Sequence, residues 1–163
     1  MAEEGEEDDD LINASGQFLG PTPGMSFFHS ADAFGMIRGG HIDVTVLGAL
    51  QVSEKGDLSN WMLPSRGIGN VGGAMDLAVG AKRVIVAMEH KGRDGEPKVV
   101  SECSFPLTSP TCVSLIVTDI AVISVGQKGL ILKETAPGWG LEDVQKETEP
   151  ELIPADDLKE IEL

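Results

Sequence analysis

A glycine-rich stretch, GIGNVGGAMDLAVGAKRVIVAMEH, runs from Gly67 to His90 and has the residue types best suited to chemistry. Glycine accepts a positive φ and lets a ligand approach the main chain without a Cβ in the way. A glycine loop that leads into a helix also presents free N–H groups and the positive end of the helix dipole. Such a loop suits an anion, either a phosphate or the oxyanion that develops on a carbonyl. The alternative is that these glycines only permit a tight turn.

Several common site motifs do not fit the sequence. No Lys-Ser or Lys-Thr follows the glycines, so the loop is not a P-loop, and GIGNVGGAMD does not clearly follow a strand as a dinucleotide fingerprint should. No Gly-x-Ser-x-Gly elbow of a serine hydrolase is present. The three histidines, His29, His41 and His90, are far apart and lack the spacing of metal ligands. We therefore expect no metal site.

A second polar cluster, QVSEKGDLSNWM, follows an apolar, β-branched run. Its polar residues are Gln51, Ser53, Glu54, Lys55, Asp57 and Asn60. If that run is a strand, they lie at its carboxyl end, where open α/β sheets usually place ligands. The alternative is a polar turn with a Lys-Gly-Asp bend.

The elements that would position these two clusters alternate between strands and helices. We expect a short helix over Ser30–Arg38, stopped by two glycines, and a strand buried on both sides over His41–Ser53. A helix of small residues from about Ala74 to Ala81 and a strand over Arg83–Glu89 then complete a βαβ-like unit.

The remainder of the chain predicts further short elements. Three apolar runs follow in SLIVTDIAVISVGQKGLILKETAPG, and the last two are separated by Gly126–Gly129 as in a hairpin. The segment LEDVQKETEPELIP predicts a short acidic helix that stops near Pro150. This alternation indicates an α/β layer architecture.

The charge is concentrated at the two ends of the chain. The 163 residues have a net charge of −15; residues 1–10 hold seven acids and no base, and residues 142–163 hold nine acids against Lys146 and Lys159. The intervening residues carry 11 acids and 10 bases, so an anionic small ligand is compatible with this region. No basic stripe exists to bind nucleic acid. We expect both acidic ends to be solvated tails.

Length and cysteine content favour one reduced domain inside the cell. No apolar run approaches the roughly 20 residues of a membrane span, and the acidic start MAEEGEEDDD does not resemble a secretory signal. Cys103 and Cys112 are too few for a disulfide framework or a four-thiolate zinc site. We expect a cytoplasmic protein that does not bind membranes.

Five blocks of the sequence resemble the B subunit of 3-oxoacid CoA-transferases of the succinyl-CoA:acetoacetate type. The blocks are DLINASGQ, PGMSFFHSADAFGMIRGGHIDVTVLGALQVSEKGDLSNWMLP, GNVGGAMDLAVGAKRVIVAMEH, CSFPLTSPTCVSLIVTDIAV and GLILKETAPG. They run in the family's order from Asp10 to about Gly140. The resemblance implies a three-layer α/β/α CoA-transferase fold with a mostly parallel sheet over residues 11–141. An acidic disordered tail (1–10) and an acidic helix and tail (142–163) would flank it.

The resemblance also implies a ping-pong transferase with no metal and no bound organic cofactor, because the CoA thioester is itself a substrate. In the family, a glutamate attacks the acyl-CoA and becomes a glutamyl-CoA thioester, while main-chain N–H groups stabilise the oxyanions. The family's glycine loop matches Gly72-Gly73-Ala74, with Gly73 foremost. Gln51 and Asn60, in the matching block after the predicted strand, are candidates for the wall of the substrate pocket. The CoA-transferase A subunit would supply much of the CoA site, in a hetero-oligomer that binds acyl-CoA and a 3-oxoacid.

One part of the family's pattern is absent. The family's nucleophile lies in a Ser-Glu-Asn-Gly segment shortly before the DLINA block, and this sequence contains no such segment. None of Glu3, Glu4, Glu6 and Glu7 is followed by Asn-Gly, and a solvated tail would not shield an anhydride from water. We therefore expect an N-terminally truncated chain, without an assigned catalytic residue, that is inactive alone and exposes an apolar face.

Two alternatives stay open. The chain could be a non-catalytic remnant of the same fold that binds acyl-CoA or its partner. It could instead be an unrelated α/β domain, similar to sugar-phosphate isomerases, that shares only the glycine loop.

Overall fold

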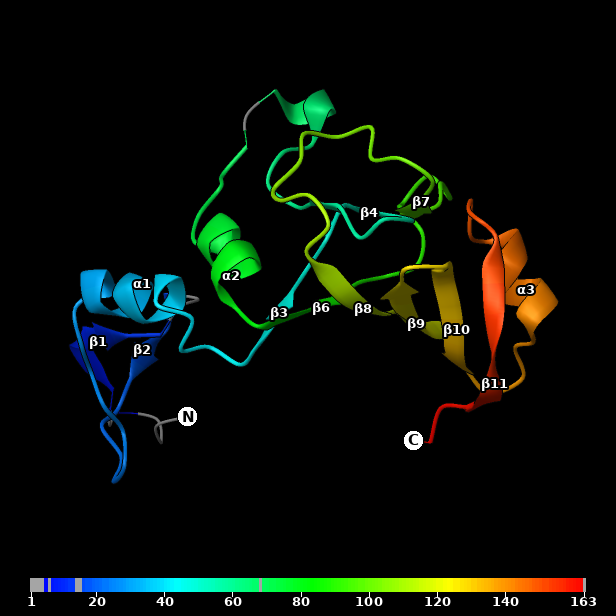
Figure 1. Ribbon diagram of the computed structural model, residues 1–163. Helices are drawn as coiled ribbons and strands as arrows, with labels where there is room; N and C mark the ends of the chain where they lie inside the picture. The colour runs from blue at the N-terminus through cyan, green and yellow to red at the C-terminus, as the bar shows by residue number, and fades with distance from the viewer. Residues whose placement is uncertain (1–4, 6, 14–15, 68, 163) are drawn as a thin grey trace. The chain divides into compact units, whose positions relative to one another are not determined.

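The computed structural model describes residues 5, 7–13, 16–67 and 69–162, which form two units, residues 1–33 and 34–163 (Figure 1). In the first unit, β1 (Asp8–Ile12) pairs antiparallel with β2 (Phe18–Leu19). The tail predicted for residues 1–10 falls partly outside the described residues. Its last three residues lie in β1 rather than in a tail, because β2 supplies a hydrogen-bonding partner.

A six-stranded sheet forms the centre of the second unit, in the order β11-β10-β9-β8-β6-β3. Three of its five pairings are parallel (β3 with β6, β6 with β8 and β10 with β11), which confirms the predicted α/β class with a mostly parallel sheet. The strands are β3 (Val44–Leu47), β6 (Arg83–Ala87), β8 (Val113–Val117), β9 (Ala121–Gly126), β10 (Gly129–Thr135) and β11 (Leu152–Glu160).

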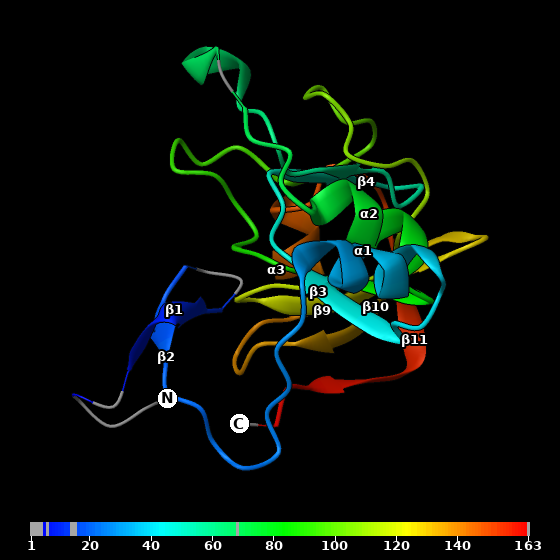
Figure 2. The ribbon, with the colours of Figure 1, turned by 90° about the vertical axis from the view of Figure 1, so that its left-hand side faces the viewer.

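The helices follow the sequence pattern closely. The helix α1 (Ser30–Arg38) begins in the first unit and ends in the second, with the predicted bounds. The helix α2 (Ala74–Gly80) contacts β3 (Figure 2), and α3 (Leu141–Lys146) contacts β10; a 3₁₀ turn, η1 (Pro64–Arg66), precedes α2. The hairpin predicted at Gly126–Gly129 is confirmed between β9 and β10.

The single strand predicted over His41–Ser53 is wrong. The chain leaves the main sheet after Leu47, and β4 (Gln51–Ser53) joins a second sheet between β5 (Leu58–Ser59) and β7 (Val99–Val100). All three residues of β4 are buried by these neighbours. The strand β3, by contrast, is an edge strand and is not buried on both sides.

The two faces of the main sheet differ in exposure. On one face, the register aligns Thr45 with Val84, and Val86 with Ile116, and all four residues are buried. On the opposite face, Val44 is 48% exposed and Val46 is 61% exposed. The edge strand β3 therefore exposes two valines on this face.

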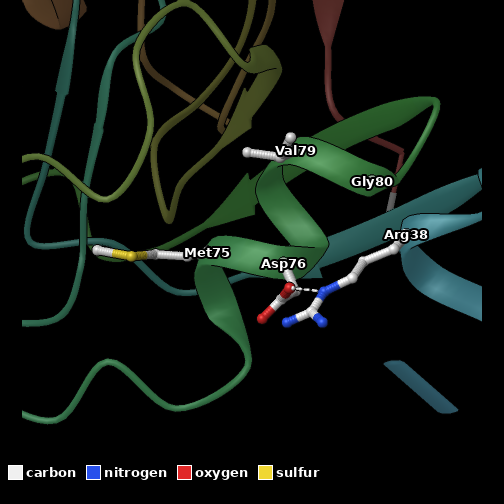
Figure 3. Close-up of a pocket in the computed structure, with 5 residues that line it drawn as sticks. All are labelled: Arg38, Met75, Asp76, Val79 and Gly80. Atoms are coloured by element: carbon white, nitrogen blue, oxygen red, sulfur yellow. Dashed lines mark hydrogen bonds and ion pairs between the residues drawn. The ribbon is translucent and has the colours of Figure 1, made fainter. Parts of the chain in front are cut away.

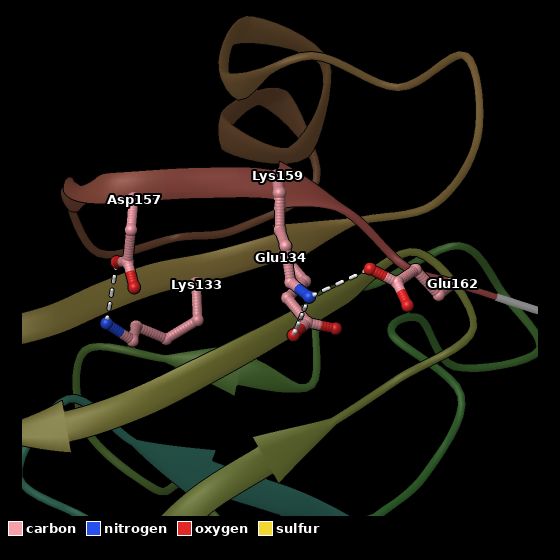
Figure 4. A network of polar contacts seen from close by, with 5 residues as sticks. All are labelled: Lys133, Glu134, Asp157, Lys159 and Glu162. Carbon is pink, nitrogen blue, oxygen red and sulfur yellow. Dashed lines mark hydrogen bonds and ion pairs between the residues drawn. The ribbon is translucent and has the colours of Figure 1, made fainter.

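The acidic C-terminal segment also departs from expectation, because residues 152–160 form a strand rather than a solvated tail. Leu152 is buried against the core, and β11 pairs in parallel with β10. Lys133 Nζ lies 3.1 Å from Asp157 Oδ1, and Lys159 Nζ lies 3.9 Å from Glu134 Oε1 and 3.4 Å from Glu162 Oε1 (Figure 4). The two lysines thus offset part of the negative charge of this segment. Because β11 is an edge strand of the sheet, its other acidic side chains can stay in water.

Candidate functional site

The glycine turn leads directly into α2, and its residue Gly72 has a left-handed backbone conformation. Gly72 has a φ of +51°, which favours glycine, and an added Cβ there would meet open space. The Gly72 N–H donates to Asn70 Oδ1 at 3.2 Å, so this N–H is already occupied. Gly73 is the N-cap, with φ −88° and ψ 1°.

The next two N–H groups are available. Within the described residues, no hydrogen bond occupies the N–H of Gly73 or of Ala74, while the Gly73 carbonyl accepts from the Leu77 N–H at 3.1 Å. A Cβ added to Gly73 would lie 3.2 Å from Cζ of Phe34 in α1, so this glycine also allows close packing. The predicted Gly72-Gly73-Ala74 turn therefore offers two main-chain donors, at Gly73 and Ala74.

The two residues predicted for the pocket wall make hydrogen bonds within the protein. Buried Gln51 accepts through Oε1 from the main-chain N–H groups of Ser104 at 2.9 Å and Phe105 at 3.1 Å. Its Nε2 donates to Ser104 Oγ at 3.1 Å. Gln51 thus fixes the turn at residues 104–105.

Asn60 holds two neighbouring loops in the same way. Its Oδ1 accepts from Thr108 Oγ1 at 2.7 Å, and its Nδ2 donates to the Gly48 carbonyl at 3.1 Å. Among the described residues, no hydrogen bond links Gln51 or Asn60 to the glycine turn. Both residues therefore position loops, and their place in a substrate pocket stays a prediction.

A larger hollow, of about 730 Å³, lies next to the turn that Gln51 fixes. Leu50, just before β4, the turn η1, the charged loop KGRDGEPK after β6, and Phe105 line it. Its lining residues are Leu50, Leu63, Pro64, Ser65, Arg66, Glu89, Lys91, Gly92, Arg93, Asp94, Glu96, Lys98 and Phe105. Sequence reasoning missed this hollow, although the run of charges after an apolar strand was a usable signal.

A smaller hollow, of about 370 Å³, lies beside α2 and contains none of the predicted site residues (Figure 3). Arg38, Met75, Asp76, Val79 and Gly80 line it. Arg38 Nε donates to Asp76 Oδ1 at 2.6 Å, so the two charged groups already satisfy each other. We assign it no role in the site.

The buried histidine is saturated by hydrogen bonds. Thr148 Oγ1 lies 2.9 Å from His90 Nε2 and donates its own proton to the Val144 carbonyl, so Nε2 must be the donor. Thr118 Oγ1 lies 3.0 Å from Nδ1 and 3.2 Å from the Ala121 carbonyl oxygen, and its single proton can be donated to only one of these two acceptors. Burial lowers the pKa of His90, which favours this neutral form. His90 therefore has a structural role.

The other candidate groups offer little for chemistry. Burial raises the pKa of both Cys103 and Cys112, so these thiols are poor nucleophiles. In the part of the chain that the structure describes, no cluster of three His, Cys, Asp or Glu side chains could hold a metal ion. No helix there is long and apolar enough to cross a membrane.

Comparison with known proteins shows the family. Residues 1–147 match the family described as Coenzyme A transferase. The chain is 51% identical over 148 residues to the B subunit of succinyl-CoA:3-ketoacid coenzyme A transferase of Helicobacter pylori, covering 91% of this chain and 72% of that protein. It is 53% identical over 143 residues to the B subunit of 3-oxoadipate CoA-transferase of Pseudomonas putida, covering 87% and 67%. It is 45% identical over 153 residues to the beta subunit of acetate CoA-transferase of Haemophilus influenzae, covering 94% and 69%.

Solved structures show the same fold at lower sequence identity. The acyl-CoA transferase YdiF apoenzyme of Escherichia coli O157:H7 matches with a TM-score of 0.77 at 19% identity, over 93% of this chain and 33% of that one. Glutaconate coenzyme A-transferase of Acidaminococcus fermentans matches with a TM-score of 0.59 at 20% identity, over 73% and 52%. This chain thus spans a third to a half of these two larger chains. It has the CoA-transferase fold, and it belongs to the coenzyme A transferase family as a B subunit.

Proposed function

We propose that this chain acts with an A subunit to move CoA from succinyl-CoA to a 3-oxoacid such as acetoacetate. The observation that carries the proposal is the Gly72-Gly73-Ala74 turn, which presents two available N–H groups in a chain 51% identical to the B subunit of a succinyl-CoA:3-ketoacid transferase. Relatives named for 3-oxoadipate and for acetate match about as well, so the choice of acid is part of the proposal. The A subunit and the substrates in this proposal are inferred from the names of these relatives.

The proposed reaction uses a carboxylate nucleophile. A glutamate attacks the thioester carbonyl of succinyl-CoA, which forms an acyl-glutamyl anhydride and releases CoA thiolate. The thiolate then attacks the glutamyl carbonyl, which gives a glutamyl-CoA thioester and frees succinate. The acceptor acid reverses both steps and leaves as its CoA thioester.

The glycine turn would stabilise the tetrahedral oxyanion that forms at each attack. The N–H groups of Gly73 and Ala74 are the donors for it, because main-chain amides that are already in place need no reorganisation. Because the sequence contains no Ser-Glu-Asn-Gly, the attacking glutamate is not assigned to any residue of this chain. The second candidate function is a non-catalytic protein that binds acyl-CoA or its partner.

The test compares two versions of the chain, each mixed with an A subunit. One is the chain as it stands, and the other carries an N-terminal extension with the Ser-Glu-Asn-Gly segment of a relative. We expect transfer of CoA from succinyl-CoA to acetoacetate in the extended pair only. Transfer by the unextended pair would show that another carboxylate attacks. No transfer by an extended pair that assembles and binds succinyl-CoA would overturn the proposed function and leave the binding role.

A further inference from the structure

The hollow of about 730 Å³ contains a half-buried cation, Lys98. The main chain of this residue is fixed, because its N–H donates to the His90 carbonyl at 3.1 Å and its carbonyl accepts from the Val52 N–H at 2.9 Å. The main chain of Lys98 is therefore fixed between His90, which follows β6, and Val52 of β4. Burial lowers the pKa of its ammonium, which shows that the group has lost part of its hydration.

The charges around Lys98 leave it without a close counterion. Lys91, the other half-buried lysine of the hollow, pairs with Glu147 at 2.5 Å. Among the described residues, no carboxylate oxygen lies within 4.0 Å of the Lys98 ammonium. The carboxylates of Glu89, Asp119 and Glu96 favour the charged form of Lys98, but all three residues are exposed, so water screens much of their charge. Lys98 is thus a half-buried charge of the hollow that has no ion-pair partner among the described residues.

Apolar side chains lie beside this charge. Leu50, Leu63 and Phe105 line the hollow and are each half-buried. The main chain of Phe105 is held by the hydrogen bond to Gln51. A cation flanked by apolar surface matches a short carbon chain that ends in a carboxylate.

The position of the hollow relates it to the glycine turn. Leu50 follows β3 and Glu89 follows β6, so the hollow lies at the carboxyl ends of these two parallel strands. The helix α2 ends just before β6 starts, so its first turn, at Gly73 and Ala74, faces the same edge of the sheet. Both features therefore belong to the edge where α/β sheets bind ligands.

We infer that this hollow binds the free carboxylate of a dicarboxylic acyl group, such as succinyl, with Lys98 as its counterion. The inference rests on the proposed function, in which the thioester carbonyl of the same group is held at the glycine turn. Gln51 contributes as a positioning residue, through the turn that contains Phe105.

The test is the binding of succinate to the full chain, followed by isothermal titration calorimetry, with acetate as the matched monocarboxylate. We expect Lys98→Met to weaken succinate binding by at least roughly tenfold, since a charge-assisted contact is lost, and Lys98→Arg to retain most of it. Lys128→Met, in the exposed β9–β10 turn, is the control and should bind succinate like the unaltered chain. Circular dichroism confirms that each variant is folded.

Two results would overturn the inference: equal succinate affinity in folded Lys98→Met and unaltered chains, or no preference of the unaltered chain for succinate over acetate. These results are independent of the transfer assay. If the extended pair transfers CoA and Lys98→Met still binds succinate normally, only the inference fails. If Lys98 governs succinate binding and the extended pair transfers nothing, the transferase proposal fails.

Discussion

Gln51 Oε1 accepts a hydrogen bond from the main-chain N–H of Phe105 at 3.1 Å, across 54 residues of sequence. Gln51 is buried in the smaller sheet, while Phe105 lines the largest hollow of those described. A side chain of the second sheet therefore determines where an aromatic wall of the candidate pocket lies.

Replacing Gln51 by leucine tests this relationship. The variant leaves the N–H groups of Ser104 and Phe105 without their acceptor, and we expect a loss of about 1–3 kcal/mol in the free energy of unfolding. Urea unfolding measures the change. Gln127→Leu, in the exposed β9–β10 turn, is the control and should change stability little. Equal stability of the two variants would mean that the hydrogen bonds from Gln51 are not needed to stabilise the turn at residues 104–105.

Gly73→Val tests the proposed oxyanion contact. In an extended pair that transfers CoA, we expect folded protein with turnover reduced roughly a hundredfold, because the side chain disturbs main-chain donors at the thioester. Initial rates with succinyl-CoA and acetoacetate measure the effect. Undiminished turnover would remove Gly73 from the site.

The packing of Gly73 against Phe34 requires a control for this variant. A Cβ at Gly73 would lie 3.2 Å from the Phe34 ring, so valine could act by displacing that ring. We expect the double variant Gly73→Val, Phe34→Ala to regain stability without regaining turnover. If turnover returns as well, the glycine is needed for packing and not for the substrate.

The elements that the sequence predicts well are those with a local signal. The bounds of α1, the start of α2 and the β9–β10 hairpin follow from helix spacing and turn glycines. The break between Leu47 and Gln51 could not be predicted, because apolar β-branched residues look alike whether one sheet or two receive them. The strand β11 was missed because its acids resemble a tail, and its partner β10 is recognised only in the folded chain.

The candidate site also has one part that the sequence predicts and one part that it does not. The Gly72-Gly73-Ala74 turn is visible in the sequence as a glycine cluster before a helix. Lys98 was not noticed, because η1 and Phe105, which line the same hollow, lie 32 or more residues before it and seven residues after it. Only tertiary structure distinguishes it from the exposed charges around it.

The strand β11 should depend on charge only weakly. The pair Lys133–Asp157 is solvent-exposed, so we expect Lys133→Met to lower the midpoint of thermal unfolding slightly at low salt and not at about 1 M salt, where such pairs are screened. Leu130→Ala in the same strand β10 is the comparison: it removes a fully buried side chain and should cost about 2–5 kcal/mol at either salt concentration. A large, salt-independent effect of Lys133→Met would show that the ion pair is structurally important.

His90 should make stability depend on pH. Because burial lowers its pKa in the folded chain below the unfolded value of about 6.5, the unfolded chain takes up the proton first as the pH falls. The contribution of neutral His90 is thus complete above about pH 6.5 and declines below it, by at most about 1.4 kcal/mol per pH unit. The nearby carboxylates of Asp119 and Glu147 favour the charged form and limit the decline.

Urea unfolding of the chain and of His90→Gln between about pH 7.5 and pH 5 measures this dependence, with the difference in slope as the readout. We expect the variant to be less stable at the upper end of this range, because glutamine fits the hydroxyls of Thr118 and Thr148 less well. We also expect it to lose less stability on acidification. The exposed His41→Gln serves as the control and should keep the slope of the unaltered chain. If the free energy of unfolding falls with pH equally for His90→Gln and the unaltered chain, the imidazole of His90 binds its proton equally well in the folded and in the unfolded chain.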